Sequence, residues 1–201
     1  MIELLVATRN RHKTPEIQHI LGPEFKARDL GVHPDVSEIR ESGTSFEENA
    51  TLKALAASRH LPALVIADDS GLEVDALGGA PGIYSARYAG ANATSRDKID
   101  KLLRELARVR STDNGRRARF RCVVALARNG DLLGMFEGTV QGRITDTARG
   151  DSGFGYDPIF VPDGFEQTFG ELSEEVKNTI SHRAKAIRAL ADRLQRLEFG
   201  G

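Results

Sequence analysis

The chain has no tryptophan and one cysteine, Cys122. A lone cysteine cannot form an internal disulfide, which favours a reducing compartment. Cys122 lies in the apolar segment 120–126, so we expect a buried thiol rather than a nucleophile. No stretch approaches the roughly 20 apolar residues of a membrane helix, and the N-terminus lacks the basic flank of a signal peptide. These absences predict a cytoplasmic protein with no membrane partner.

The chain also lacks an excess of charge of either sign. The chain carries 28 Lys+Arg against 29 Asp+Glu, a net charge of −1. No global field therefore recruits nucleic acid or an anionic membrane, and any polyanion must be bound by a local group of cations. The 201 residues contain no repeat, low-complexity tract or linker. We expect a single domain over residues 1–201, with two lobes around one cleft.

Apolar periodicity predicts alternating strands and helices. In the N-terminal half, strand–helix units are expected, with an extended region near 32–38. The segment Asn129-Gly130 between two apolar runs indicates a β-hairpin. The predicted strands are 3–7, 63–68, 118–127 and 132–143, and the predicted helices are 16–21, 46–59, 96–109 and 182–197. This pattern predicts an α/β protein with a two-lobed mixed β-sheet, flanking helices and a central cleft.

Two adjacent carboxylates, Asp68 and Asp69, follow the apolar run 64–67 and precede Ser70. Successive side chains of a strand point to opposite faces, so only one carboxylate can face a given site. Ligand sites of α/β sheets gather at the carboxyl ends of strands, and carboxylates there suit Mg²⁺. By itself, however, Asp-Asp at a strand end is more often a solvated turn.

A polar loop between the first strand and helix resembles a phosphate site. Free backbone N–H groups and the positive end of a helix dipole attract phosphate. The loop lacks the glycines of a Walker A motif, and a basic turn is more often simply solvated. Its residues are Thr8, Arg9, Asn10, Arg11, His12 and Lys13. Thr14-Pro15 has the pattern of an N-cap followed by Pro, which places the helix start at Pro15.

Two acids near the second predicted helix have different explanations. Ser45 and Glu48 stand at capping-box spacing, which accounts for Glu48 structurally. Glu41 has no such role and lies in a loop that can approach Asp69. One carboxylate from each of two segments is a common way to hold Mg²⁺. Which of Glu41 and Glu48 is the second metal contact stays open at this point.

The segment 150–160 combines glycines, aromatics and an acid. Phe154 or Tyr156 offers a face for stacking a base, and Gly155 permits close approach of backbone. Asp157 precedes Pro158, which keeps it extended and orients an acceptor for a purine N–H edge. The alternative is a glycine-rich turn with aromatics in the core.

Cations recur near the C-terminal helix. Lys177, His182 and Arg183 cluster around a predicted N-cap at Ser181. Donors at this point suit a phosphate or a base carbonyl oxygen. A histidine at a helix start is more often an incidental surface residue.

Taken together, these segments resemble the inosine triphosphate pyrophosphatases, which act on non-standard purine nucleotides. The resemblance rests on Ala7-Thr8-x-Asn10-x-x-Lys13, on residues 42–54, 67–90 and 154–158, and on Lys177 with Ser181-His182-Arg183. The 22 residues from 67 to 88 are the most specific part. His12 departs from the glycine of many members, which leaves the shape of the phosphate loop open.

The resemblance implies a homodimer that hydrolyses dITP, ITP and XTP to the monophosphate and pyrophosphate, with Mg²⁺ as cofactor. It implies that Asp69 is the general base and a metal ligand, with Glu41 as the second metal contact and Ser70 as a substrate contact. The loop from Thr8 to Lys13, with Lys177, would hold the triphosphate. Phe154, Gly155, Tyr156, Asp157, His182 and Arg183 would surround the base.

Other functions stay possible from the residues alone. A Maf-type pyrophosphatase would act on pyrimidine or modified nucleotides. A nucleic-acid-binding module would use Arg116, Arg117, Arg119 and Arg121, of which the last three share one strand face, and would bind with steep salt dependence. A nucleotide sensor without activity is disfavoured, because the chain keeps both the acids and the cations that the chemistry requires.

Overall fold

The computed structural model describes residues 1–8, 10, 13–33, 39, 41–109 and 116–199. The chain divides into two compact units. The first comprises Met1–Asp69, Cys122–Gly138 and His182–Gly201, and the second comprises Ser70–Arg121 and Thr139–Ser181. No helix in the described ranges is both long and apolar enough to cross a membrane. The cleft and the single domain over 1–201 stay predictions.

Six strands of the described chain form one mixed sheet in the order β2-β1-β3-β4-β5-β6. Strand β1 pairs in parallel with β2 and β3, and β5 pairs antiparallel with β6. Asn129 and Gly130 join β4 to β5 with φ of 53° and 85°, the left-handed backbone of a tight hairpin turn. The strands are β1 (Ile2–Val6), β2 (Phe25–Asp29), β3 (Leu64–Val74), β4 (Arg117–Arg128), β5 (Asp131–Ile144) and β6 (Phe160–Pro162). The predicted α/β fold with a mixed sheet and the predicted hairpin are confirmed.

Two of the predicted helices begin directly after a capping residue. Ser45 accepts a hydrogen bond from the N–H of Glu48 at 3.1 Å, and Thr94 forms a capping box with Asp97. The α-helices are α1 (Lys13–Leu21), α2 (Phe46–His60), α3 (Ser95–Arg108), α4 (Glu174–Ile180) and α5 (His182–Phe199). Short 3-10 turns are η1 (Leu30–Val32), η2 (Asp75–Leu77), η3 (Gly82–Arg87) and η4 (Asp157–Ile159).

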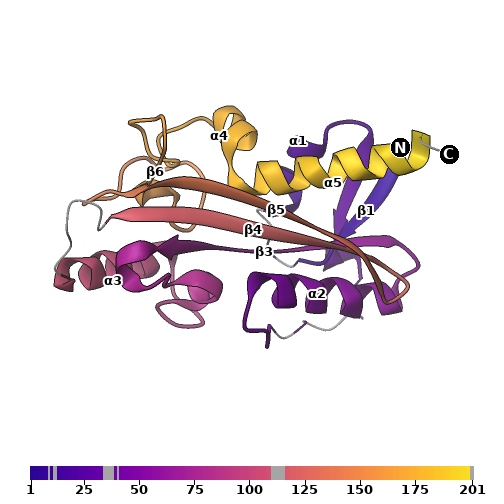
Figure 1. Cartoon of the computed structure of the whole chain (residues 1–201), viewed down its shortest axis with the longest axis horizontal. Helices are drawn as coiled ribbons and strands as arrows, with labels where there is room; N and C mark the ends of the chain where they lie inside the picture. Colours follow the sequence, from indigo (N-terminus) through magenta and orange to yellow (C-terminus); the bar gives the residue numbers. More distant parts are fainter. Residues whose placement is uncertain (9, 11–12, 34–38, 40, 110–115, 200–201) are drawn as a thin grey trace. The chain divides into compact units, whose positions relative to one another are not determined.

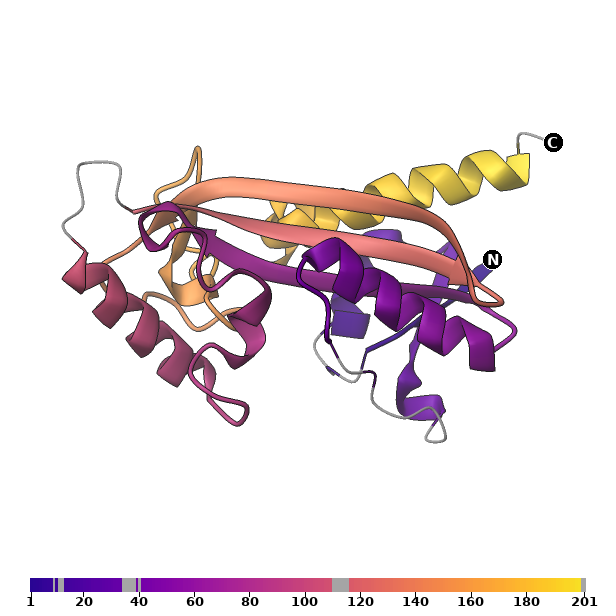
Figure 2. The same cartoon turned by 60° about the horizontal axis from the view of Figure 1, so that its bottom comes forward.

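In the first unit, α1 and α5 lie on one side of the strands and α2 lies on the other (Figure 1). Turning the molecule brings α2 in front of the strands, with α5 behind them (Figure 2). Strand β5 approaches α5 closely at Gly138, where a Cβ would lie 2.0 Å from the carbonyl oxygen of His182. The buried core combines residues of the strands with one face of α1 and α5: Leu4, Val6, Ile17, Ile66, Val124, Leu126, Ile187 and Leu190.

The second unit has its own core. Phe160 lies at its centre, with ring centroids 4.7 Å from Phe120 and 5.3 Å from Phe169. Helix α3 adds an apolar stripe, of which Ile99, Leu102 and Leu106 are buried. Each unit therefore buries an apolar cluster that holds its polar segments in place.

Strand β3 differs from the prediction in its length. The expected strand ended at Asp68, but β3 continues through Asp69 and Ser70 to Val74. Each carboxylate has a lysine partner from a neighbouring helix, Lys13 of α1 for Asp68 and Lys53 of α2 for Asp69. The pairing of β1 with β3 reaches only Ile66, and Ala7 donates its N–H to the carbonyl of Ile66 at 2.7 Å. The carboxylates therefore lie next to the carboxyl end of β1.

The N-terminal region also differs from the prediction, in the start of α1 and in the strand β2. Helix α1 begins at Lys13 rather than at Pro15, and Lys13 donates its N–H to the carbonyl of Asn10 at 3.1 Å. Proline is tolerated throughout the first helical turn, because no N–H there needs an intrahelical partner. Strand β2 was missed by the prediction. In the expected extended region near 32–38, Val32 belongs to the turn η1, and residues 34–38 lie outside the described residues.

Candidate active site

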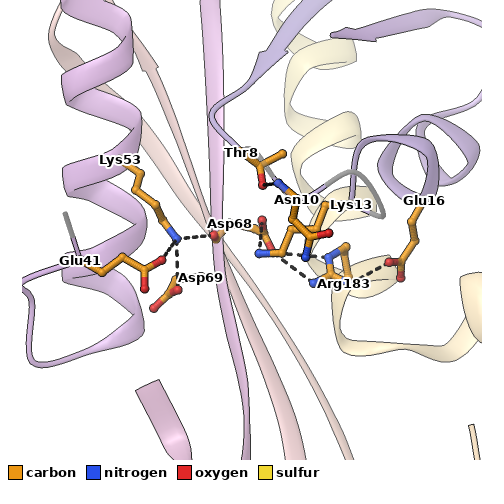
Figure 3. Close-up of polar contacts among 9 residues, drawn as sticks. All are labelled: Thr8, Asn10, Lys13, Glu16, Glu41, Lys53, Asp68, Asp69 and Arg183. Atoms are coloured by element: carbon orange, nitrogen blue, oxygen red, sulfur yellow. Dashed lines mark hydrogen bonds and ion pairs between the residues drawn. The ribbon is translucent and has the colours of Figure 1, made fainter. Parts of the chain in front are cut away.

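Asp68 and Asp69 point to opposite faces of β3, as the alternation of strand side chains predicts (Figure 3). Asp68 faces Lys13 and Arg183, whereas Asp69 faces Lys53 of α2. Both aspartates are buried, at 4% and 7% exposure. The two acids therefore share a burial class but have different partners.

Asp68 belongs to a buried ion-pair network. Its Oδ1 lies 2.9 Å from Lys13 Nζ, and its Oδ2 lies 3.2 Å from Nη2 of Arg183. Nη1 of Arg183 lies 2.8 Å from Oε2 of Glu16. Burial acts to raise the pKa of Asp68, but Lys13 and Arg183 outweigh it and hold that pKa well below its usual range. Asp68 is therefore a permanent anion that compensates two cations.

The ionised form of Asp69 is less stabilised by its neighbours than that of Asp68. Its Oδ1 lies 3.1 Å from Lys53 Nζ, which also lies 2.8 Å from Oε1 of Glu41 and donates to the carbonyl of Asp68 at 2.8 Å (Figure 3). Burial raises the pKa of Asp69 above its ordinary value, although Lys53 acts in the opposite direction. A carboxylate with a raised pKa is a better proton acceptor than an ordinary surface aspartate. Of the two buried aspartates of β3, Asp69 is the one suited to a general base.

Two residues of α2 escaped the sequence prediction. Lys53 bridges Glu41 and Asp69, and Asn49 donates from Nδ2 to Oδ2 of Asp69 at 3.2 Å. Both lie on the buried side of α2, where apolar residues are expected. Polar residues at positions i and i+4 of an otherwise apolar stripe are the signal that could have found them.

Glu41 and Glu48, the two candidates for a second metal contact, have different partners in the structure. Oε2 of Glu48 accepts from the N–H and the hydroxyl of Thr44, at 2.6 and 3.0 Å. The backbone N–H of Thr44 is the main cause that lowers the pKa of Glu48. Glu48 therefore binds Thr44 at the start of α2, whereas Glu41 and Asp69 both form an ion pair with Lys53. Across the described residues, no group of three or more His, Cys, Asp or Glu is arranged to hold a metal.

The predicted phosphate loop is only partly described. Thr8 Oγ1 accepts a hydrogen bond from the N–H of Asn10 at 3.1 Å. Lys13 is the first residue of α1, and its ammonium donates to Oδ1 of Asp68. The predicted contacts Arg9, Arg11 and His12 lie outside the described residues. The role of this loop stays a prediction.

In the second unit, three predicted residues come together. Oδ2 of Asp157 accepts from the N–H of Phe154 at 2.7 Å and from Lys177 Nζ at 2.6 Å. Lys177 Nζ also lies 4.8 Å from the centroid of the Phe154 ring. Gly153 has φ of +75°, and a Cβ there would lie 2.1 Å from Oδ2 of Asp157. A glycine is thus needed beside this buried ion pair.

The remaining predicted contacts occupy varied environments. Tyr156 is 3% exposed and donates a hydrogen bond from its hydroxyl to the carbonyl of Ser85 at 3.0 Å, so it belongs to the core. Phe154, in contrast, is half-buried. Gly155 donates its N–H to Ser95 Oγ at 3.2 Å. His182, the first residue of α5, is buried at 5% exposure, and Ser70 is half-buried on β3.

The arginine-rich face of β4 carries local counter-charges. Arg117 forms a two-point ion pair with Asp163, at 2.7 and 2.9 Å, and Arg119 pairs with Glu73. Acids thus already neutralise these two cations. This pairing weakens the alternative in which the face binds a nucleic-acid backbone.

These observations define an α/β protein with a buried carboxylate and lysine cluster beside the end of a parallel strand. The chain belongs to the Ham1 family, whose sequence model matches residues 4–193. It is similar to the dITP/XTP pyrophosphatase of Shouchella clausii, with 47% identity over 195 residues, covering 97% of this chain and 98% of that protein. The dITP/XTP pyrophosphatase of Bacillus subtilis is 43% identical over 196 residues, with 97% and 98% covered.

Solved structures agree with this assignment. A Ham1 protein from Coxiella burnetii superposes with a TM-score of 0.88 at 40% identity, covering 98% of this chain and 100% of that chain. The Staphylococcus aureus Ham1 protein gives a TM-score of 0.84 at 42% identity, with 96% and 98% covered. The family resemblance and the mixed α/β fold expected from the sequence are therefore confirmed.

Proposed function

We propose that this protein hydrolyses the triphosphates of non-standard purines, dITP, ITP and XTP, to the monophosphate and pyrophosphate in the cytoplasm. Two relatives that cover nearly the whole chain are dITP/XTP pyrophosphatases. The observation that carries the proposal is the buried carboxylate of Asp69, which has a raised pKa and donors on both oxygens. Such a group is suited to accept a proton from water.

The proposed reaction begins with water and Asp69. The carboxylate accepts a proton from the water as its oxygen attacks the α-phosphorus. The bond from the α-phosphorus to the bridging oxygen breaks, and pyrophosphate leaves with the electron pair. Asp69 then releases its proton to solvent, which restores the carboxylate for the next cycle.

Lysines supply the positive charge that this reaction needs. Fixed cations beside a developing anion lower the barrier, because they require no reorganisation during the step. In the first unit, Lys13 and Lys53 are each held by buried carboxylates. We propose that Lys13, with Thr8 and Asn10, contacts the triphosphate, and that Lys177 is a further phosphate contact.

The donor set around Asp69 fits Mg²⁺. Glu41 and Asp69 provide carboxylate oxygens on two segments, and Mg²⁺ commonly takes one or two carboxylates together with substrate phosphates. The Lys53 ammonium lies 2.8 Å from Glu41 and 3.1 Å from Asp69, and this shared negative charge supports the proposal of a cation there. Bound there, Mg²⁺ would neutralise charge on the phosphates and lower the pKa of water. Glu41 and Asp69 are therefore the proposed metal contacts.

Base selection is proposed to rest on hydrogen-bond donors. Hypoxanthine and xanthine carry a carbonyl at C6, whereas adenine carries an amino group. The resemblance supports His182 and Arg183 as these donors, although Arg183 also binds Asp68 and Glu16. They would pair with the carbonyl but would face the amino hydrogens of adenine. Unpaired buried donors can discriminate by about 10⁴. Phe154, Gly155, Tyr156, Asp157 and Ser70 stay predicted substrate contacts on the strength of the resemblance.

The oligomeric state is a separate proposal. The resemblance implies a homodimer, which light scattering on the purified chain would measure directly. A mass of twice 21.9 kDa is expected, and a mass of 21.9 kDa at all concentrations would refute the homodimer.

Release of pyrophosphate tests the proposed function. Phosphate would be measured with and without added inorganic pyrophosphatase, for dITP, XTP, dATP, dGTP and dTTP, in the presence and absence of Mg²⁺. Signal for dITP and XTP that needs both Mg²⁺ and the coupling enzyme is expected. A preference for dTTP would favour the Maf-type alternative. Phosphate without the coupling enzyme would indicate stepwise phosphatase chemistry, and no turnover would refute the proposal.

A further inference from the structure

The side-chain amide of Asn49 is a buried polar group that neither the capping of α2 nor the proposed chemistry uses. Ser45 and Glu48 already serve the start of α2. Asn49 is 0% exposed, between the buried residues Phe46 and Lys53 of the same helix face. A buried amide is costly unless its hydrogen bonds are made. Its partners therefore indicate what it does.

We propose that Asn49, itself fixed by Gly43, is a positioning residue that holds the carboxylate of Asp69 in one orientation for the reaction. This inference rests on the proposed function of Asp69. Asn49 Nδ2 donates to Oδ2 of Asp69 at 3.2 Å, and Lys53 Nζ contacts Oδ1 at 3.1 Å. Asn49 and Lys53 are one helical turn apart, so a single rigid helix contacts both oxygens. Rotation of the carboxylate would break both contacts.

Gly43 determines which end of the amide faces Asp69. The N–H of Gly43 donates to Oδ1 of Asn49 at 2.9 Å. Because a donor must meet the amide oxygen, Oδ1 faces Gly43 and the NH₂ group faces Asp69. A flipped amide would place Oδ1 against the Asp69 carboxylate and two N–H groups against each other. The orientation of Asn49 is thus determined by two neighbours rather than by packing alone.

The close approach of Gly43 leaves no room for a side chain. A Cβ at this position would lie 2.8 Å from Oδ1 of Asn49 and 2.7 Å from Cβ of Glu48. The Gly43→Ala substitution should therefore displace the Asn49 amide without changing any group that the reaction uses. It provides a second way to disturb Asp69 through Asn49.

Two variants and one control test the inference. Asn49→Leu keeps the approximate shape and removes both hydrogen bonds, whereas Gly43→Ala keeps the asparagine but displaces its amide. The control is Ser58→Ala, because Ser58 is a buried polar residue of the same helix that accepts the N–H of Gly130 at 3.0 Å. We expect kcat for dITP to fall about tenfold to a hundredfold in the first two variants and to stay unchanged in Ser58→Ala. The KM for dITP should change by less than about threefold, because the chemical step is affected more than binding.

A double-mutant cycle separates positioning from simple destabilisation. Asn49→Leu would be made in the wild-type and in the Asp69→Asn background, and rates would be measured in single turnovers with excess enzyme. If Asn49 acts through Asp69, its substitution has no further effect once Asp69 is replaced. A merely structural role predicts the same fold-loss in both backgrounds.

The outcomes distinguish the two proposals. If the wild type does not release pyrophosphate from dITP, the proposed function fails. If the wild type is active and Asn49→Leu and Gly43→Ala keep kcat, the positioning role is wrong while the function stands. If Asn49→Leu does not fold, Gly43→Ala decides, and unchanged kcat in that variant overturns the inference.

Discussion

Asp68 and Asp69 are adjacent in sequence and similarly buried, but they lie on opposite faces of β3 (Figure 3). Asp68 compensates Lys13 and Arg183, and its pKa lies well below the usual range. Asp69 faces Lys53 and Asn49, and burial raises its pKa. The comparison teaches that partners rather than burial decide whether a carboxylate is a fixed structural anion or a proton acceptor.

The strongest test of this comparison replaces Asp69. Asp69→Asn keeps the shape but cannot accept a proton, so we expect kcat for dITP to fall by about 10³-fold or more. Nucleotide affinity, measured by calorimetry, should change only a few-fold. Full activity in this variant would contradict the role of Asp69.

Replacing the neighbouring aspartate should damage stability first. Asp68→Asn leaves Lys13 and Arg183 without their shared buried anion, which is expected to reduce the free energy of unfolding by about 3 kcal/mol. Urea unfolding would measure the change, with Asp69→Asn as the matched control that should show no such loss. Equal losses in both variants would remove the distinction between the two acids.

Replacing Glu41 tests whether it is the second proposed metal contact beside Asp69. Glu41→Gln removes one proposed metal contact, so the Mg²⁺ concentration for half-maximal activity should rise about tenfold. Glu48→Gln is the matched control, because Glu48 binds Thr44 at the start of α2. A Mg²⁺ titration that moves only in Glu48→Gln would reverse the assignment.

The pH dependence of stability should have opposite signs for the two variants. The low pKa of Asp68 contributes stability that is present above the unfolded pKa of about 3.9 and is lost as pH falls below it. The raised pKa of Asp69 contributes stability that is present below about pH 3.9 and is lost as pH rises through the folded pKa. At pH 7, Asp68→Asn should thus be less stable than wild type and Asp69→Asn more stable. Both differences should shrink in acid, and urea titrations between pH 3 and 7 would show whether they do.

The predictable part of the fold is local. Helix α2 was expected because Ser45 and Glu48 mark its start, and the β4–β5 hairpin because Asn129-Gly130 suits a left-handed turn. Strand β2 was missed because it has only five residues, Phe-Lys-Ala-Arg-Asp, and only two of them are apolar. Its pairing with β1 supplies what the sequence signal lacks.

The site was predictable only where a residue's type already indicates its chemistry. Asp69 and Glu41 stood out as acids in loops or at a strand end, and Lys177 and Asp157 within specific motifs. Asn49 and Lys53 did not, because their meaning depends on the packing of α2 against β3. The burial of Arg183 against Glu16 and Asp68 likewise depends on contacts between distant segments.

The most direct test of the central claim is hydrolysis of dITP in ¹⁸O-labelled water, with mass spectrometry of the products. If water activated by Asp69 attacks the α-phosphorus, one ¹⁸O atom appears in the nucleoside monophosphate and none in pyrophosphate. Label in pyrophosphate instead would show attack at the β-phosphorus and would contradict the account.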